Sequence, residues 1–163
     1  EGEVLWQKAG LVEYDKGDLL FGFPRDTLQN DGIPGGIASS AAMLLHLTKK
    51  SIRNINLLSG EVLWSVAPKG WKIPDYDKRY ARVEFDATRK QAFIPQKNSI
   101  LAVSYESGAS TWSAQPVLKG HPYQMAIVDQ GLLVLGGVDP QKEGDHDFIT
   151  LLDPAKLEAR AAR

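Results

Sequence analysis

A five-residue motif is repeated in this chain, and the repetition restricts the possible folds more than any other feature of the sequence. Gly-Glu-Val-Leu-Trp spans Gly2–Trp6 and returns at Gly60–Trp64, and a degenerate third copy spans Gly108–Trp112. A gap-free shift of residues 44–65 by 48 positions gives seven identities in 22 positions. A chain in which one sequence motif recurs at a similar spacing is expected to be an array of similar supersecondary elements.

Each copy has the pattern of an antiparallel β-meander. In the second copy, short apolar segments alternate with polar breaks and with the Ser59-Gly60 turn, a pattern typical of strands joined by hairpins. Gly60 suits a turn that needs a positive φ. Ser39–Lys50 also has good helix propensity. We favour a strand there because the equivalent of its second half, Ala92–Lys97, contains Pro95 and places Phe93 and Ile94 at strand-like positions.

Four-stranded units of about 40–50 residues predict an all-β fold built from β-propeller blades. We expect one partial propeller domain over residues 1–163, with about three blades after a leading outer strand. Because propellers close with roughly four to eight blades, we expect a fragment of a seven- or eight-bladed ring, or several chains completing one. The expected parts are an outer strand at 1–8, a blade at 11–66 with a loop at 25–40, and blades at 82–114 and 123–162.

In the later blades the expected strands are Arg82–Asp86, Gln91–Pro95, Ser99–Tyr105, Ser110–Ala114, Tyr123–Asp129, Gly131–Gly136, Asp147–Leu152 and Leu157–Ala162. The tryptophans are expected to cover the border between neighbouring sheets, because a large ring at the outermost strand can fill that seam. The predicted structural repeat residues are Gly2, Trp6, Gly60, Trp64, Gly108 and Trp112.

The stretch Ile55–Trp64 resembles the blade signature of pyrroloquinoline-quinone-type repeats, in which a Thr/Ser-Gly turn leads into a strand that carries Trp. Ser104–Trp112 resembles it more loosely, and Thr150–Ala155 lacks both the Gly and the Trp. Cofactor-using members of the family hold the quinone over calcium, and no residue here matches their ligands or base. The resemblance therefore implies no catalytic residue, and neither the quinone nor calcium is expected in this segment.

We expect a non-catalytic scaffold or binding module. The alternative is part of a quinoprotein dehydrogenase whose catalytic residues lie outside this segment. The expected partners are the remaining blades of a larger propeller or another copy of the chain, with a protein ligand as a further option. The family is best known from bacterial proteins outside the cytoplasm, so the resemblance implies a periplasmic or secreted location.

Composition excludes several other classes of function. The 19 basic and 20 acidic side chains nearly cancel, so the net charge gives no attraction to nucleic acid. No apolar run reaches the roughly 20 residues of a membrane-spanning helix. The chain has no cysteine, which excludes thiol catalysis, disulfides and cysteine-based metal sites.

Two segments could carry binding sites. The loop at residues 139–147 offers carboxylates that could hold calcium, although a solvated hairpin loop is the simpler interpretation; its candidate ligands are Asp139, Glu143, Asp145 and Asp147. The connection Ala67–Tyr80 places aromatic residues among lysines and could form a partner surface; its aromatics are Trp71, Tyr76 and Tyr80. The alternative is that these rings fold back onto their own sheet.

Overall fold

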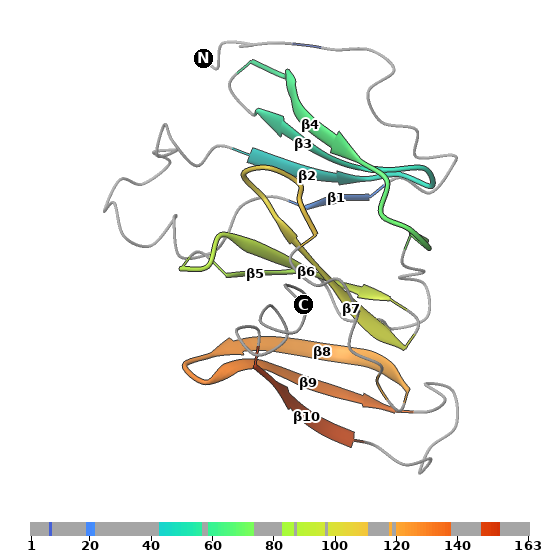
Figure 1. Cartoon of the computed structure of the whole chain (residues 1–163), viewed down its shortest axis with the longest axis vertical. Helices are drawn as coiled ribbons and strands as arrows, with labels where there is room; N and C mark the ends of the chain where they lie inside the picture. Colours follow the sequence, from blue (N-terminus) through green and yellow to red (C-terminus); the bar gives the residue numbers. More distant parts are fainter. Residues whose placement is uncertain are drawn as a thin grey trace, which may run out of the picture. The chain divides into compact units, whose positions relative to one another are not determined.

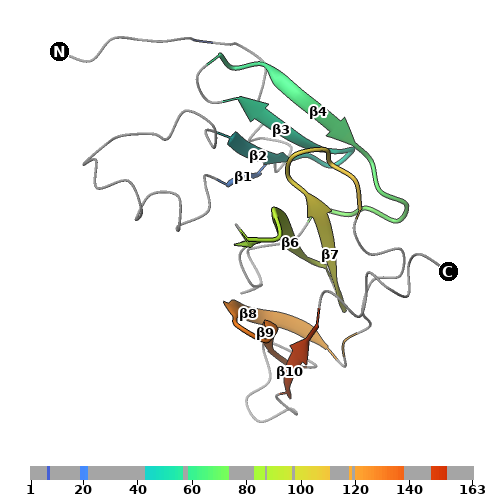
Figure 2. The same ribbon diagram turned by 60° about the vertical axis from the view of Figure 1, so that its left-hand side comes forward.

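The computed structural model describes an all-β chain made of antiparallel sheets (Figures 1 and 2). The residues that it describes are 7, 19–21, 43–56, 59–73, 83–86, 88–96, 98–110, 118, 120–137 and 148–153. They contain no helix, and hence no helix that could span a membrane. By its internal contacts the chain divides into two compact units, one made of Glu1–Ile73 with Tyr105–Gly108 and the other of the remaining residues.

The first unit contains a four-stranded meander in the order β1-β2-β3-β4. Its strands are β1 (Leu19–Phe21), β2 (Met43–Leu47), β3 (Ile52–Asn56) and β4 (Val62–Val66). The strand that we favoured over a helix within Ser39–Lys50 is therefore confirmed. The expected loop at 25–40 lies outside the described residues. So does the expected outer strand at 1–8, Trp6 included, except for Gln7, which is not part of a strand.

Local side-chain chemistry sets the turn between β2 and β3. The Thr48 hydroxyl oxygen accepts hydrogen bonds from the backbone N–H groups of Lys50 (3.1 Å) and Ser51 (2.9 Å). The Thr48 N–H donates to the Ser51 carbonyl at 2.8 Å. A short hydroxyl side chain that satisfies the N–H groups of the following residues is a common way to close a tight turn.

The second unit contains two three-stranded sheets, ordered β5-β6-β7 and β10-β9-β8. The strands are β5 (Glu84–Asp86), β6 (Gln91–Gln96), β7 (Ser99–Ser104), β8 (His121–Val128), β9 (Gly131–Gly137) and β10 (Phe148–Leu152). Six of the strands expected from the sequence are thus confirmed within a few residues. Of the fourth strand expected at Ser110–Ala114, only Ser110 is described, and it forms a single bridge to Val103. The strand expected at Leu157–Ala162 lies outside the described residues.

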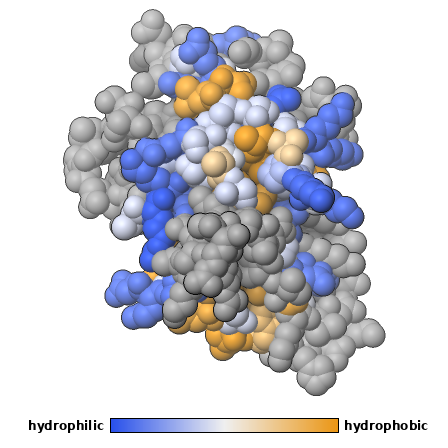
Figure 3. All heavy atoms as spheres, viewed as in Figure 1, coloured by the Kyte–Doolittle hydropathy of each residue, from blue (hydrophilic) through white to orange (hydrophobic). Residues whose placement is uncertain are grey.

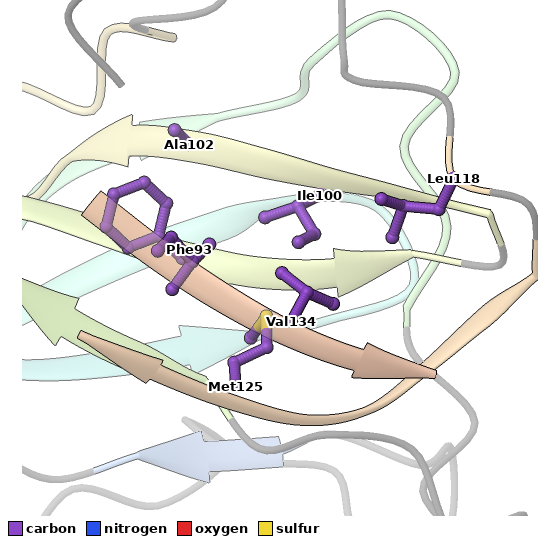
Figure 4. Packing of buried hydrophobic residues seen from close by; sticks show 7 residues of the cluster. Phe93, Ile100, Ala102, Leu118, Met125 and Val134 are labelled. Carbon is purple, nitrogen blue, oxygen red and sulfur yellow. The ribbon is translucent and has the colours of Figure 1, made fainter. Parts of the chain in front are cut away.

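An apolar cluster joins the two sheets of the second unit. Side chains from β6 and β7 point toward side chains from β8 and β9 (Figure 4). The cluster is made of Phe93, Ile100, Ala102, Leu118, Met125, Leu132 and Val134. Burial of such side chains is the main favourable term in folding, about 1.5–3 kcal/mol for each large one.

We expect Leu132→Ala to lower the free energy of unfolding by about 2–5 kcal/mol, because Leu132 is fully buried and its removal leaves a cavity. Leu151→Ala is the matched control, since the same side chain is 52% exposed there, and it should cost less than half as much. Urea denaturation followed by circular dichroism at low protein concentration measures both values. Equal costs would contradict the core described above.

Candidate functional site

Trp64 docks on the turn at Tyr105–Gly108, which belongs to the same compact unit. The indole Nε1–H donates a hydrogen bond to the backbone carbonyl of Tyr105 at 2.9 Å. Trp64 is half-buried on β4, the last strand of its sheet. A residue of one repeat copy therefore holds the turn of the next copy, 41 positions further along the chain.

Asn54 supports the same contact from the neighbouring strand. Asn54 lies directly opposite Trp64 in the register of β3 and β4, and it is 1% exposed. Its Nδ2 also donates to the Tyr105 carbonyl, at 2.5 Å. A carbonyl oxygen has two lone pairs, so this one acceptor takes a donor from each of two adjacent strands.

Gly108 is required at its position for two separate reasons. Its φ is +74°, a left-handed conformation that costs residues with a Cβ roughly 1–2 kcal/mol. A Cβ at this position would also lie 2.6 Å from Cε3 and 2.8 Å from Cδ2 of Trp64. The indole ring therefore packs directly on the glycine backbone, where no side chain fits.

The turns of the two repeat copies share backbone geometry as well as sequence. Gly60, the equivalent of Gly108 in the preceding copy, has a φ of +69°. The Asn56 N–H donates to the Glu61 carbonyl at 2.8 Å, and the equivalent bond 48 positions later, from Ser104 to Ala109, is also 2.8 Å. The prediction that Gly60 adopts a positive φ in a turn is confirmed.

Trp71 folds back onto its own unit. Its indole N–H donates to the carbonyl of Thr48 at 2.9 Å, beside the turn between β2 and β3, and its backbone N–H donates to Pro68 at 3.0 Å. This contact favours the interpretation in which the Trp71 ring folds back onto its own sheet. Tyr76 and Tyr80, the other members of the expected partner surface, lie outside the described residues.

The other predicted site residues are not brought together in the described part of the chain. Among the residues that the structure describes, no group of three or more His, Asp or Glu side chains could hold a metal ion. The candidate calcium ligands lie outside these residues, together with three glycine and tryptophan positions of the repeat; they are Asp139, Glu143, Asp145, Asp147, Gly2, Trp6 and Trp112.

Sequence reasoning identified Trp64 and Gly108 but missed Asn54. The sequence pattern that could have indicated Asn54 is a polar residue between the apolar Ile52 and Ile55 in a strand that is mostly buried. A buried amide needs hydrogen-bond partners. The partner is a backbone carbonyl 51 positions away, which no side-chain motif could indicate.

Comparisons with known proteins assign no family to the chain. No family model matches it, and no curated protein matches it. Among solved structures, it is similar to the crystal structure of the computationally designed Ika4 protein, with a TM-score of 0.45 and 11% sequence identity. The match covers 68% of this chain, which spans 61% of the designed protein. At this level the likeness assigns neither a family nor a function.

We expect Gly108→Ala to destabilise the protein by about 1–3 kcal/mol more than Gly70→Ala, because the added methyl group forces the indole ring away. Gly70 is a matched control, since its φ of +78° imposes the same backbone strain while a Cβ there would meet nothing within 4 Å. Urea denaturation of the two variants measures the difference. Similar losses for both would show that backbone strain alone explains the glycine.

The docking also predicts coupling between Trp64 and Gly108. Trp64→Phe keeps an aromatic ring but loses the hydrogen bond to Tyr105, which should cost about 1 kcal/mol. Because Gly108→Ala displaces the same ring, the two changes should be non-additive by about 0.5–3 kcal/mol. The pair Trp64→Phe and Gly70→Ala should be additive within about 0.5 kcal/mol. A double-mutant cycle that is additive for both pairs would contradict direct docking.

Proposed function

We propose that the chain is a run of β-propeller blades of the pyrroloquinoline-quinone-type repeat class and that it works as a non-catalytic scaffold or binding module. The observation that carries the proposal is the packing of Trp64 on Gly108, with its indole N–H bonded to Tyr105. A tryptophan of one copy meets the glycine turn of the following copy. Such a contact can join successive blades throughout an array.

The sheet architecture supports the same proposal. The strands within each sheet follow one another as antiparallel neighbours, so every sheet is a simple meander. This is the strand order that propeller blades use. The first sheet has four strands, and the other two have three each within the described residues.

The recurring residues build structure and supply no reactive group. Gly60 and Gly108 form turns, while Trp64 packs and donates one hydrogen bond. These recurring residues therefore lie at turns and at the contact between successive copies of the repeat, as a scaffold requires. Recognition on such a scaffold belongs to the loops that connect its strands.

A cofactor assay tests the non-catalytic part of the proposal. The chain is incubated with calcium and pyrroloquinoline quinone, and reduction of an electron-accepting dye is followed with ethanol or glucose as substrate. We expect no reduction above that of free quinone and no shift of the melting temperature by quinone and calcium. A known quinoprotein dehydrogenase is the positive control. Saturable quinone binding or substrate-dependent reduction by the chain would favour the quinoprotein alternative.

A further inference from the structure

Two turns that carry lysines lie at the same end of the sheet β1-β2-β3-β4. The first turn, at residues 48–51, joins β2 to β3, and the second, at residues 67–72, follows β4. They meet because Ile52, which follows the first turn, pairs with Val66, which precedes the second. Figures 1 and 2 both show the chain leaving β4 beside the turn between β2 and β3.

Trp71 fastens the second turn to the first. Its indole Nε1–H donates to the Thr48 carbonyl at 2.9 Å. Its backbone N–H donates to the Pro68 carbonyl at 3.0 Å, which closes a four-residue turn around Gly70. The φ of Gly70 is +78°, as the third residue of a type II turn requires. A specific hydrogen bond therefore holds the two turns together.

Four exposed lysines surround this hydrogen bond. Each lies within two positions of one of the two residues that the bond joins; they are Lys49, Lys50, Lys69 and Lys72. We call them the lysine cluster. Strongly hydrophilic side chains project at this end of the sheet, toward the right of the space-filling view (Figure 3).

The lysine cluster is a local excess of positive charge. Within the described part of the chain, no ion pair joins it to a carboxylate. The described acidic residues of the first unit are Glu61, beside the turn at the opposite end of the sheet, and Glu106. The adjoining residues 74–80 carry two acidic and two basic side chains and add no net charge. Four positive charges thus lie together on a chain whose net charge is −1.

We infer that the lysine cluster binds an acidic segment of a partner protein. Opposite charges on two surfaces steer their association and set its specificity. A lysine ammonium is a compact point charge, which contacts carboxylates one at a time, without the bidentate fork of arginine. Lysines on two joined turns therefore suit carboxylates that are spaced along a peptide. The half-buried ring of Trp71 lies between the two turns and adds apolar surface.

A short acidic segment fits this surface better than nucleic acid does. Proteins that bind DNA commonly neutralise about 6–10 phosphates, whereas the cluster supplies four ammonium groups. A long polyanion would also extend beyond the cluster toward the exposed carboxylates of Glu61 and Glu106. The inference rests on the proposed function in one respect, since it names the class of partner for a binding module.

Fluorescence anisotropy with a dye-labelled oligoglutamate peptide tests the inference on the whole chain. We expect saturable binding at low ionic strength that weakens as salt is added, because exposed charges are screened beyond about 10 Å in 0.1 M salt. Lys50→Glu and, independently, Lys69→Glu should each weaken binding about threefold to tenfold, because each replaces an attraction with a repulsion. Lys90→Glu is the matched control, since it reverses the charge of an exposed lysine in the second unit, and it should leave binding unchanged. Circular dichroism checks that the variants keep the β-sheet spectrum of the parent.

Trp71→Phe separates a joint site from a simple excess of charge. The variant keeps every charge and an aromatic ring, but it loses the hydrogen bond to Thr48 that holds the two turns together. Binding should weaken at least about twofold, because the lysines are no longer held in place before the peptide arrives. An affinity equal to that of the parent would contradict a site built from both turns.

Three further results would overturn the inference. The first is no saturable binding of the peptide at low ionic strength. The second is binding that neither Lys50→Glu nor Lys69→Glu weakens more than Lys90→Glu does. The third is tighter binding of an oligothymidylate, or of vesicles that contain phosphatidylserine, through the same lysines. The quinone assay measures none of these, so failure of this inference is distinguishable from failure of the non-catalytic proposal.

Discussion

The carbonyl of Tyr105 accepts two hydrogen bonds from adjacent strands, and the contact of Trp64 with the following turn depends on it. One donor is the indole of Trp64 and the other is the amide of Asn54. Because the two donors face each other across β3 and β4, the position of the carbonyl fixes the turn relative to the sheet. Gly108 completes the contact, since its missing side chain lets the ring reach the backbone. The hydrogen bonds to the Tyr105 carbonyl and the absence of a side chain at Gly108 thus both hold the same turn against the sheet.

Coverage of apolar sheet faces is the second constraint on this chain. In β7, side chains that point to both faces are buried. In β9 the sequence is equally apolar, but one of the two faces stays exposed. Contiguous exposed aliphatic surface of this kind favours association. The burial of apolar sheet faces therefore accounts for the core of the second unit.

The sequence predicted the all-β class, most of the described strands and the turn glycines, because these follow from local patterns. Alternation of apolar segments with Gly and polar breaks locates hairpins, and the gap-free alignment of residues 44–65 with residues 92–113 places Gly60 and Gly108 in equivalent turns. The contact of Asn54 with a distant backbone carbonyl had no such local signal. Nor could composition distinguish the covered face of β9 from its exposed face, since Leu132 and Leu133 are the same residue type. Only the strand register separates them.

Differences in chemical tolerance explain why the turn residues Ser59 and Gly60 recur as Ser107 and Gly108, whereas most apolar strand positions differ between the two copies. An apolar strand position accepts other hydrophobic residues of similar volume at modest cost, so Leu45 and Phe93 can occupy equivalent sites. A turn position with positive φ beneath an indole ring accepts glycine alone. The length of the connections between strands varies more freely. Residues 22–42 link β1 to β2, whereas residues 87–90 suffice between β5 and β6. Under the proposed function, we expect binding specificity to arise in such connections, because they can change without disturbing the contact of Trp64 with the turn at Tyr105–Gly108.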